Sequence, residues 1–177
     1  MKKYEFTGET KEIVLPYRNA VLHRIRAIAD FGTVKVGDLG GWIEKEENLS
    51  HEGNAWVRGD AKVYGNAKVY DNAEVYGNAK VYDNAKVCDN ALVRGDAEIF
   101  LTSQVLTIGP IGSRNGFTTF YRDKDNEITV KCGCFLGKME QFLEKVEQTY
   151  GDSKHGQVYR AAAEMAKIQI DLEPENR

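Results

Sequence analysis

A six-residue period occupies the middle of the chain. From Ala55 to about Phe100 the sequence reads, without interruption, AWVRGD, AKVYGN, AKVYDN, AEVYGN, AKVYDN, AKVCDN, ALVRGD and AEIF. Each unit begins with alanine and carries valine or isoleucine two positions later. A fixed period names the architecture directly, because every unit must repeat the same local structure. This period constrains the fold more than any other feature of the chain.

The composition of one unit predicts a short strand followed by a corner. Side chains two positions apart point to the same face of a strand, so the alanine and the valine share one face. The Gly or Asp and the Asn or Asp that follow tolerate left-handed backbone angles and favour a turn. Three such units make one coil of a triangular prism, and stacked coils pair at about 4.8 Å. The short unit favours the left-handed form, since right-handed β-helices use longer and less regular coils.

The same register extends a little beyond the regular units. Upstream, Leu49 falls on the alanine position and His51 on the valine position. Downstream, Ser103 and Val105 fall on the two inward positions. We therefore expect a short left-handed parallel β-helix of about three coils over residues 49–106, with alanine and valine inside.

The flanking segments have a different pattern and are expected to cap the prism. Residues 1–48 contain KYEFTG, EIVLPY, VLHRIRAI and GWIEKE, which predict a small N-terminal β cap. Residues 107–177 begin with FTTFYR and EITVKCGC on either side of D-K-D-N, which predicts a hairpin. Two amphipathic helices follow, the second capped by Asp152 or Ser153. The expected fold class is mainly β, with this C-terminal α+β unit.

The repeat resembles the hexapeptide-repeat superfamily of left-handed β-helices. The units VYGNAK and VYDNAK carry the resemblance, which covers Leu49 to Val105. The flanks GDLGGWIEKEENLS, TIGPIGSRNG and CGCF resemble uncharacterised hexapeptide-repeat proteins of phages and prophages. Some of those relatives carry an acyltransferase label that rests on the repeat alone, which is a fold-level analogy.

Composition narrows the classes of function. The net charge is −3, and 42% of the residues are hydrophobic. Lysines and acids are mixed along the repeat, which argues against a nucleic-acid surface. The sequence contains no apolar run long enough to span a membrane, so we expect no membrane partner. It has three cysteines, an odd number, so we expect a reduced, cytoplasmic protein.

Catalytic and metal-binding groups are sparse in the sequence. His23, His51 and His155 fall in three different segments, and none lies inside the regular prism. Acyltransferases of the superfamily use a histidine as general base, and its carbonic-anhydrase branch uses three histidines on a metal. Cys132 and Cys134 would share one face of a strand, where we expect buried small side chains. We expect no catalytic residue, no metal and no cofactor.

The outward faces of the prism carry aromatic and arginine columns. Positions 18 residues apart stack on each other, which gives two columns of interest. The first holds Arg58, Tyr76 and Arg94, and the second holds Tyr64, Tyr82 and Phe100. Exposed ladders of this kind favour a subunit or partner interface. We expect a homo-oligomer, either a trimer or a dimer.

The stretch Gly109–Gly116 is the most unusual part outside the repeat. It has three glycines, a serine, an arginine and an asparagine, and could present N–H groups and a guanidinium to an anion. The alternative is a plain connector between the prism and the C-terminal unit. The candidate ligand-binding residues are Ser113, Arg114, Asn115, Thr118 and Tyr121.

These observations favour a non-catalytic binding protein. Given the phage-type resemblance, it would counter a bacterial defence system, either by binding a host defence protein or by sequestering a signalling nucleotide. One alternative is a hexapeptide acyltransferase that uses acyl-CoA. Another is a structural, self-assembling β-helix protein.

Overall fold

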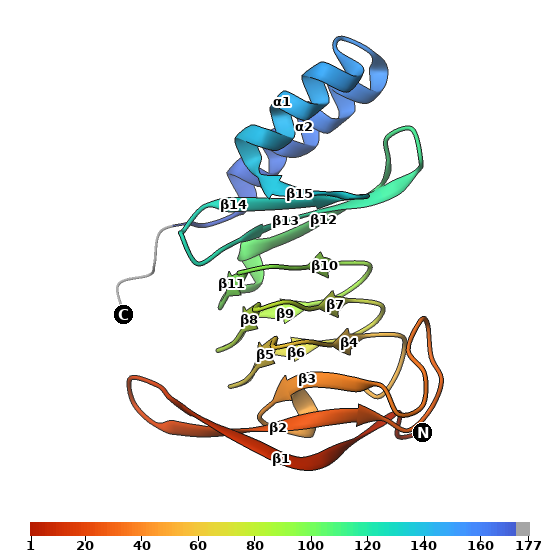
Figure 1. Ribbon diagram of the computed structural model, residues 1–177. Coiled ribbons are helices and arrows are strands. Elements are labelled where there is room, and N and C mark those ends of the chain that lie inside the picture. The colour runs from red at the N-terminus through yellow and green to blue at the C-terminus, as the bar shows by residue number, and fades with distance from the viewer. Residues whose placement is uncertain (173–177) are drawn as a thin grey trace.

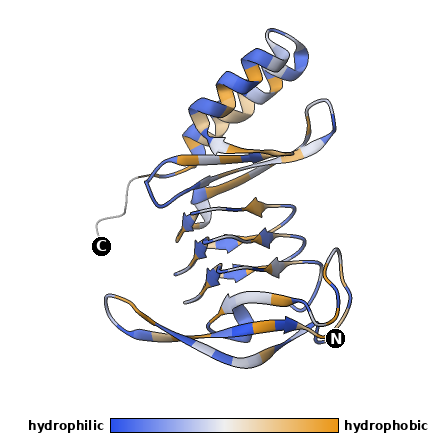
Figure 2. Cartoon of the chain, in the orientation of Figure 1, coloured by the Kyte–Doolittle hydropathy of each residue, from blue (hydrophilic) through white to orange (hydrophobic). Residues whose placement is uncertain are grey.

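The computed structural model describes residues 1–172. In it, three parts of the chain are stacked along one axis (Figure 1). A strand-rich N-terminal region lies at one end, a parallel β-solenoid of three turns in the middle, and a sheet with two helices at the other end. Hydrophobic and hydrophilic residues alternate along the elements of every part (Figure 2). The expected fold class, mainly β with a short left-handed parallel β-helix, is confirmed.

The solenoid consists of two-residue strands that stack in register. They are β4 (Trp56–Val57), β5 (Lys62–Val63), β6 (Lys68–Val69), β7 (Glu74–Val75), β8 (Lys80–Val81), β9 (Lys86–Val87), β10 (Leu92–Val93) and β11 (Glu98–Ile99). Parallel pairing joins Val57 to Val75 and Val75 to Val93. The repeated alanines and the valines from Val57 to Ile99 are buried, none more than 2% exposed. The predicted inward face is therefore confirmed.

The corners of the solenoid depend on left-handed backbone angles. Asp71, Asp83 and Asp89 have φ of 58°, 53° and 57° there, and Gly77 has φ of 79°. A Cβ built on Gly77 would lie 2.9 Å from the backbone nitrogen of Gly95, so glycine is required for close stacking as well as for its angle. Asparagines beside the corners form ladders between coils, such as Asn54 Nδ2 to Asn72 Oδ1 at 3.0 Å.

The backbone hydrogen bonds between coils of the solenoid run in one direction. The N–H of Arg58 donates to the carbonyl of Val75 at 2.9 Å, and the N–H of Tyr76 donates to the carbonyl of Val93 at 3.0 Å. The N–H groups of each coil thus point towards the C-terminal part, and the carbonyls point towards the N-terminal part. One end of the stack therefore needs hydrogen-bond donors, and the other end needs acceptors.

The N-terminal region supplies the donors. Its strands are β1 (Tyr4–Val14), β2 (Asn19–Ala27) and β3 (Leu39–Ile43), paired antiparallel in that order. β3 also pairs parallel with β5, and Trp42 N donates to the carbonyl of Ala61 at 2.9 Å. The predicted separate strands KYEFTG and EIVLPY are one strand, β1, with an irregularity between Phe6 and Thr10.

Two polar side chains complete the N-terminal cap. The ammonium of Lys3 is buried and donates to the carbonyls of Glu52, Gly53 and Ala55 at 3.3, 3.2 and 2.8 Å. The amide of the fully buried Asn48 donates to the carbonyls of Gly65 and Ala67. Asn48 ends a short 3-10 turn, Glu46–Asn48. These donors meet the open carbonyls of the first coil.

The first coil is longer than the repeat predicts. Leu49 pairs with Val69, and Ile43 pairs with Val63, so twenty residues separate positions that are eighteen apart in the regular coils. Leu49 therefore occupies the valine position, which corrects its expected place on the alanine position. The two extra residues are taken up in the turn before Ala55, where Gly53 has φ of 65°.

The C-terminal cap supplies acceptors. The N–H groups of Leu92 and Arg94 donate to Thr119 Oγ1 and Tyr121 Oη, at 3.0 and 3.2 Å. The N–H of Phe100 donates to the buried Gln104 Oε1 at 2.9 Å. Gln104 ends a 3-10 turn, Thr102–Gln104, so Ser103 does not continue the strands of the repeat, whereas Val105 packs against the solenoid core as expected. Each end of the stack is closed by groups of the polarity that it needs.

The C-terminal part is a sheet covered on one side by helices. The sheet has the order β12 (Val105–Ile111), β13 (Gly116–Arg122), β14 (Ile128–Cys132) and β15 (Phe135–Lys138), all antiparallel. The predicted hairpin at D-K-D-N joins β13 to β14. The two predicted helices are α1 (Met139–Tyr150) and α2 (Lys154–Gln169), and Ser153 caps α2. Phe120 packs under the helices, whereas Tyr121 packs on the solenoid core.

Within residues 1–172, the structure contains no helix whose length and apolar character would let it cross a bilayer.

Candidate functional site

One of the two expected interface columns is largely covered by the chain itself. Tyr64 is 7% exposed and Phe100 is 4% exposed. Leu22 and Trp42 of the N-terminal region pack on Tyr64, and the guanidinium of Arg122 lies 5.0 Å above the Phe100 ring. The expectation of an exposed aromatic column is therefore wrong for these two rings, because the caps at both ends fold over that face. Tyr82, between them, stacks on Tyr64 at 5.1 Å.

The other column remains partly exposed. The guanidinium of Arg94 lies 4.4 Å from the centre of the Tyr76 ring, as the alternation of arginine and tyrosine predicts. Arg58 lies 3.9 Å from the carboxylate of Glu74 on the neighbouring coil. These contacts stabilise the stack within one chain. An interface between chains at this column stays a prediction.

The glycine-rich stretch is the tip of a hairpin rather than a connector loop. Gly109 to Ile111 belong to β12, and Gly116 begins β13, so only residues 112–115 form the turn. Asn115 has φ of 48°, and Gly112 has φ of 77°. A Cβ on Gly112 would lie 1.8 Å from the hydroxyl of Tyr159, so this glycine lets the turn pack against α2. The packing fixes the turn beside the two helices.

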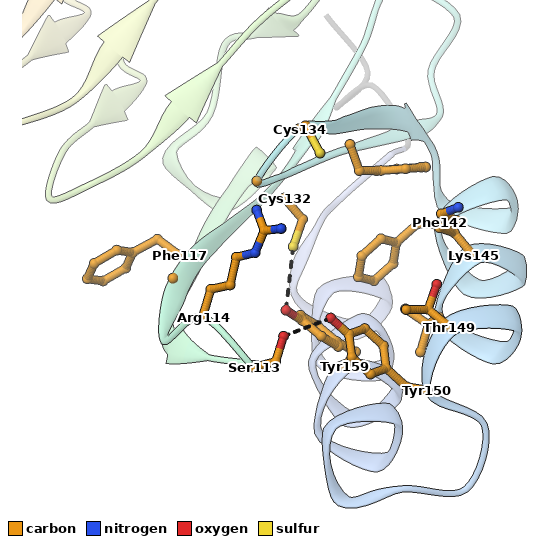
Figure 3. A pocket seen from close by; sticks show the side chains of 14 residues that line it. Ser113, Arg114, Phe117, Cys132, Cys134, Phe142, Lys145, Thr149, Tyr150 and Tyr159 are labelled. Carbon is orange, nitrogen blue, oxygen red and sulfur yellow. Dashed lines mark hydrogen bonds between the residues drawn. The ribbon is translucent and has the colours of Figure 1, made fainter.

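A cavity of about 340 Å³ lies between this turn, the β14–β15 turn and the helices. Figure 3 shows Arg114 extending from the hairpin side towards Cys132, with Phe142 opposite on α1 and Tyr159 below. Phe117 points away from this group in the same view. The lining residues are Ser113, Arg114, Gly116, Phe117, Cys132, Gly133, Cys134, Phe135, Phe142, Lys145, Val146, Thr149, Tyr150 and Tyr159.

Two of the five predicted ligand-binding residues line the cavity. Ser113 and Arg114 do so, and the Ser113 hydroxyl lies 3.1 Å from that of Tyr150. Asn115 is in the same turn but is not part of the lining. Thr118 is buried one step away, where its hydroxyl donates to Cys132 Sγ at 3.1 Å. Tyr121 faces the solenoid, since neighbouring residues of a strand point to opposite faces.

The helix residues of the cavity were not predicted from the sequence. Phe142, Val146 and Tyr159 have the spacing of ordinary core residues, and only the third dimension shows that they also border a cavity. Lys145 gives a weak signal, because it stands between two core positions of α1 and projects beside Phe142 (Figure 3). A single lysine next to an apolar stripe is too common to identify a site.

The cavity is electropositive. Neither Arg114 nor Lys145 forms an ion pair within the described residues, although many other cations of the chain do. The lining contains no aspartate or glutamate. Burial raises the pKa of the Tyr159 hydroxyl, while the charge of Arg114 acts in the opposite direction. Tyr159 is therefore a neutral hydroxyl at physiological pH, and the two cations determine the charge of the cavity.

The two neighbouring cysteines do not share a strand face. Cys132 ends β14, and Cys134 follows Gly133, whose φ is 54°, in the turn to β15. Cys134 is exposed and Cys132 is half-buried, so the expectation of two buried small side chains on one strand is wrong. The turn places both thiols in the wall of the cavity.

The histidines occupy three separate aromatic contacts. His51 stacks on Tyr4 with ring centres 4.1 Å apart, and its Nδ1 accepts the N–H of Lys3 at 3.3 Å. The neutral ring then carries its proton on Nε2, so it is a hydrogen-bond donor there rather than a base. His23 stacks on Phe6, and His155 contacts Tyr150. This arrangement fits the predicted capping role of His51.

Acidic side chains gather at the β13–β14 turn. Asp123, Asp125 and Glu127 lie close enough to share an ion. The ammonium of Lys138 lies 2.6, 3.2 and 2.7 Å from their carboxylates. Lys138 thus supplies the positive charge that this cluster needs.

Comparison with known proteins gives a partial match. No family model matches the chain. An alignment of 61 positions, which covers 32% of the chain, is 38% identical to a protein of Escherichia coli (strain K12) named "Uncharacterized acetyltransferase YdcK". The match spans 19% of that protein's length. Together with the three-turn solenoid, it fits the hexapeptide-repeat superfamily.

Proposed function

We propose that the protein is a non-catalytic binding protein whose ligand, a small organic anion, occupies the cavity of the C-terminal part. The observation that carries the proposal is the pair of unpaired cations, Arg114 and Lys145, in the wall of one apolar cavity. They come from two separate elements, the β12–β13 turn and α1. Cations without acidic partners beside an apolar surface favour an anion that is partly withdrawn from water.

A calorimetric titration with small anions tests this proposal. Removing one charge-assisted hydrogen bond costs about 1.5–3 kcal/mol, so Arg114→Ala should raise Kd about 10- to 100-fold. The side chain is exposed, and the free energy of unfolding should change by less than about 0.5 kcal/mol. Lys154→Ala is the matched control, because Lys154 is an exposed lysine outside the cavity. Equal affinity in the wild type and in Arg114→Ala would reject the role of this cavity.

The resemblance to phage and prophage proteins suggests a biological use for such a cavity. A signalling nucleotide is a small organic anion, and its sequestration would silence a bacterial defence system that responds to it. Binding of a host defence protein is the other form of this hypothesis. A panel of mononucleotides, cyclic dinucleotides and ADP-ribose separates the two forms. If no member binds, the nucleotide form is wrong.

The match to a protein named as an acetyltransferase makes acyl transfer the second candidate. The match spans less than a third of the chain, so it supports a shared repeat more than a shared reaction. The tautomer of His51 argues against its use as a base. We expect no consumption of acetyl-CoA with a panel of amine and hydroxyl acceptors. Turnover that His51→Ala abolishes would establish the enzyme.

A further inference from the structure

The walls of the cavity carry aromatic rings that contact each other in a continuous series. Phe142 lies 5.6 Å from Phe135 and 5.8 Å from Tyr159, and Tyr159 lies 5.5 Å from Tyr150. The rings of Phe142 and Tyr159 are nearly perpendicular, at 88°. Such a wall offers both ring faces and ring edges to a ligand, which is the arrangement that favours another flat ring.

Few hydrogen-bonding groups remain in these walls. The hydroxyls of Ser113 and Tyr150 are hydrogen-bonded to each other, and Cys132 Sγ accepts from Thr118. The lining contains no Asn, Gln, Asp, Glu or His side chain. A nucleobase has several polar edge atoms, and proteins recognise it by hydrogen bonds to that edge. Besides the two cations, the Thr149 hydroxyl is the main side-chain group left for the edge of a base, so several of the polar atoms of a buried base would lack partners, which is costly.

The charges complete the description of the ligand. Arg114 offers a planar fork of N–H donors that matches a carboxylate, and Lys145 offers a second positive charge from α1. We propose that the ligand class of this cavity is a small aromatic carboxylate, with the hydrocarbon ring against Phe142 and Tyr159 and the carboxylate on Arg114, while Lys145, on the far side of Phe142 in Figure 3, adds positive charge to the same cavity. This inference rests on the proposed function and narrows it from any organic anion to one chemical class.

Calorimetry with matched probes tests the inference on the full chain. The probes are 2-naphthoate, its neutral analogue 2-naphthamide, and AMP. We expect 2-naphthoate to bind, and 2-naphthamide and AMP each to bind at least about 10-fold more weakly, since one lacks the charge and the other brings a polar base. Arg114→Met should weaken 2-naphthoate about 10-fold and leave 2-naphthamide unchanged, and Lys145→Met should weaken 2-naphthoate by less than Arg114→Met does. Lys154→Met, outside the cavity, should change neither.

The cysteines provide a second measurement of binding that is independent of calorimetry. Cys132 and Cys134 line the cavity, whereas Cys88 lies on the solenoid. We expect 2-naphthoate to slow alkylation of Cys132 and Cys134 by N-ethylmaleimide and to leave that of Cys88 unchanged. Equal slowing of all three thiols, or of Cys88 alone, would place the ligand elsewhere and overturn the inference.

The outcomes separate this inference from the proposed function. Tighter binding of AMP than of 2-naphthoate, with a loss of AMP binding in Arg114→Ala, would overturn the aromatic carboxylate and keep the cavity as an anion site. Equal affinity for 2-naphthoate and 2-naphthamide would overturn it as well, because the cations would then contribute nothing. Failure of all three probes to bind would overturn the inference and count against the proposed function.

Discussion

Tyr121→Phe tests the idea that side chains close the open end of the solenoid. The Tyr121 hydroxyl is fully buried, accepts the N–H of Arg94 at 3.2 Å, and donates to the carbonyl of Arg94 at 3.0 Å. It thereby replaces the backbone that a further coil would provide. The substitution removes one oxygen and leaves the ring packed in the solenoid core.

The magnitude follows from the groups that lose their partners. Each buried polar group without a partner costs about 1–3 kcal/mol, so two backbone groups of Arg94 give a loss of about 2–4 kcal/mol after partial access to water. For a chain of this size that corresponds to a fall in Tm of about 4–16 °C. A loss this large is a considerable share of the stability of an ordinary domain.

Urea denaturation followed by tryptophan fluorescence measures the loss, since Trp56 is buried beside the N-terminal cap. The control is Tyr17→Phe, because Tyr17 is 92% exposed and its hydroxyl is in water. Hydrogen exchange should also accelerate at the N–H of Arg94 but not at that of Tyr76, which donates to Val93 inside the stack. If Tyr121→Phe unfolds within about 0.5 kcal/mol of the wild type, the capping argument is wrong.

Three further predictions concern the core, the acidic cluster and the assembly. Val81→Asp should abolish folding, because Val81 is fully buried and an unpaired charge would lie in a dry prism; soluble, folded protein would contradict the inward register. Burial opposes ionisation of Asp123, but hydrogen bonds from Lys138 and Thr129 outweigh it and lower its pKa below the usual 3.8. The ionised Asp123 carboxylate therefore contributes its full stabilisation above pH 3.8 and loses it as the pH falls through the lower folded-state pKa. Asp123→Asn should reduce the loss of stability in acid, and an unchanged dependence of stability on pH would contradict this. Light scattering should give a dimer or a trimer, and a mass near 19.9 kDa would reject the oligomer.

The sequence predicts the solenoid well because the repeat applies the same local rule many times. Alanine and valine two positions apart can only share a face, and the corner residues can only turn there. The first coil does not follow this rule. Nothing in the segment SHEGN, residues 50–54, shows that two extra residues there move Leu49 onto the valine position. The regular strands also end after Phe100, where the Gln104 side chain folds back to accept the N–H groups of Phe100 and Leu101, although Val105 still packs on the core.

The sequence predicts one wall of the cavity but not the other, because the second wall forms only when distant elements pack together. Ser113 and Arg114 stand in a visible turn signal, so the sequence locates one wall. The opposite wall comes from α1 and α2, and their packing against that turn depends on contacts such as Gly112 with Tyr159. Tyr121 was placed on the wrong side because its neighbour Phe120 alternates with it on β13, and the sequence does not show which face meets the helices.

The most direct test of the account is hydrogen exchange over the whole chain with and without 2-naphthoate. If the C-terminal cavity is the binding site, amide protection should increase in the turns at residues 112–115 and 133–134 and in α1 around Phe142 and Lys145. The solenoid corners should exchange at unchanged rates. Protection confined to the solenoid corners or to the face of Tyr76 and Arg94, with none around the cavity, would contradict the central claim. The binding site would then lie on the solenoid.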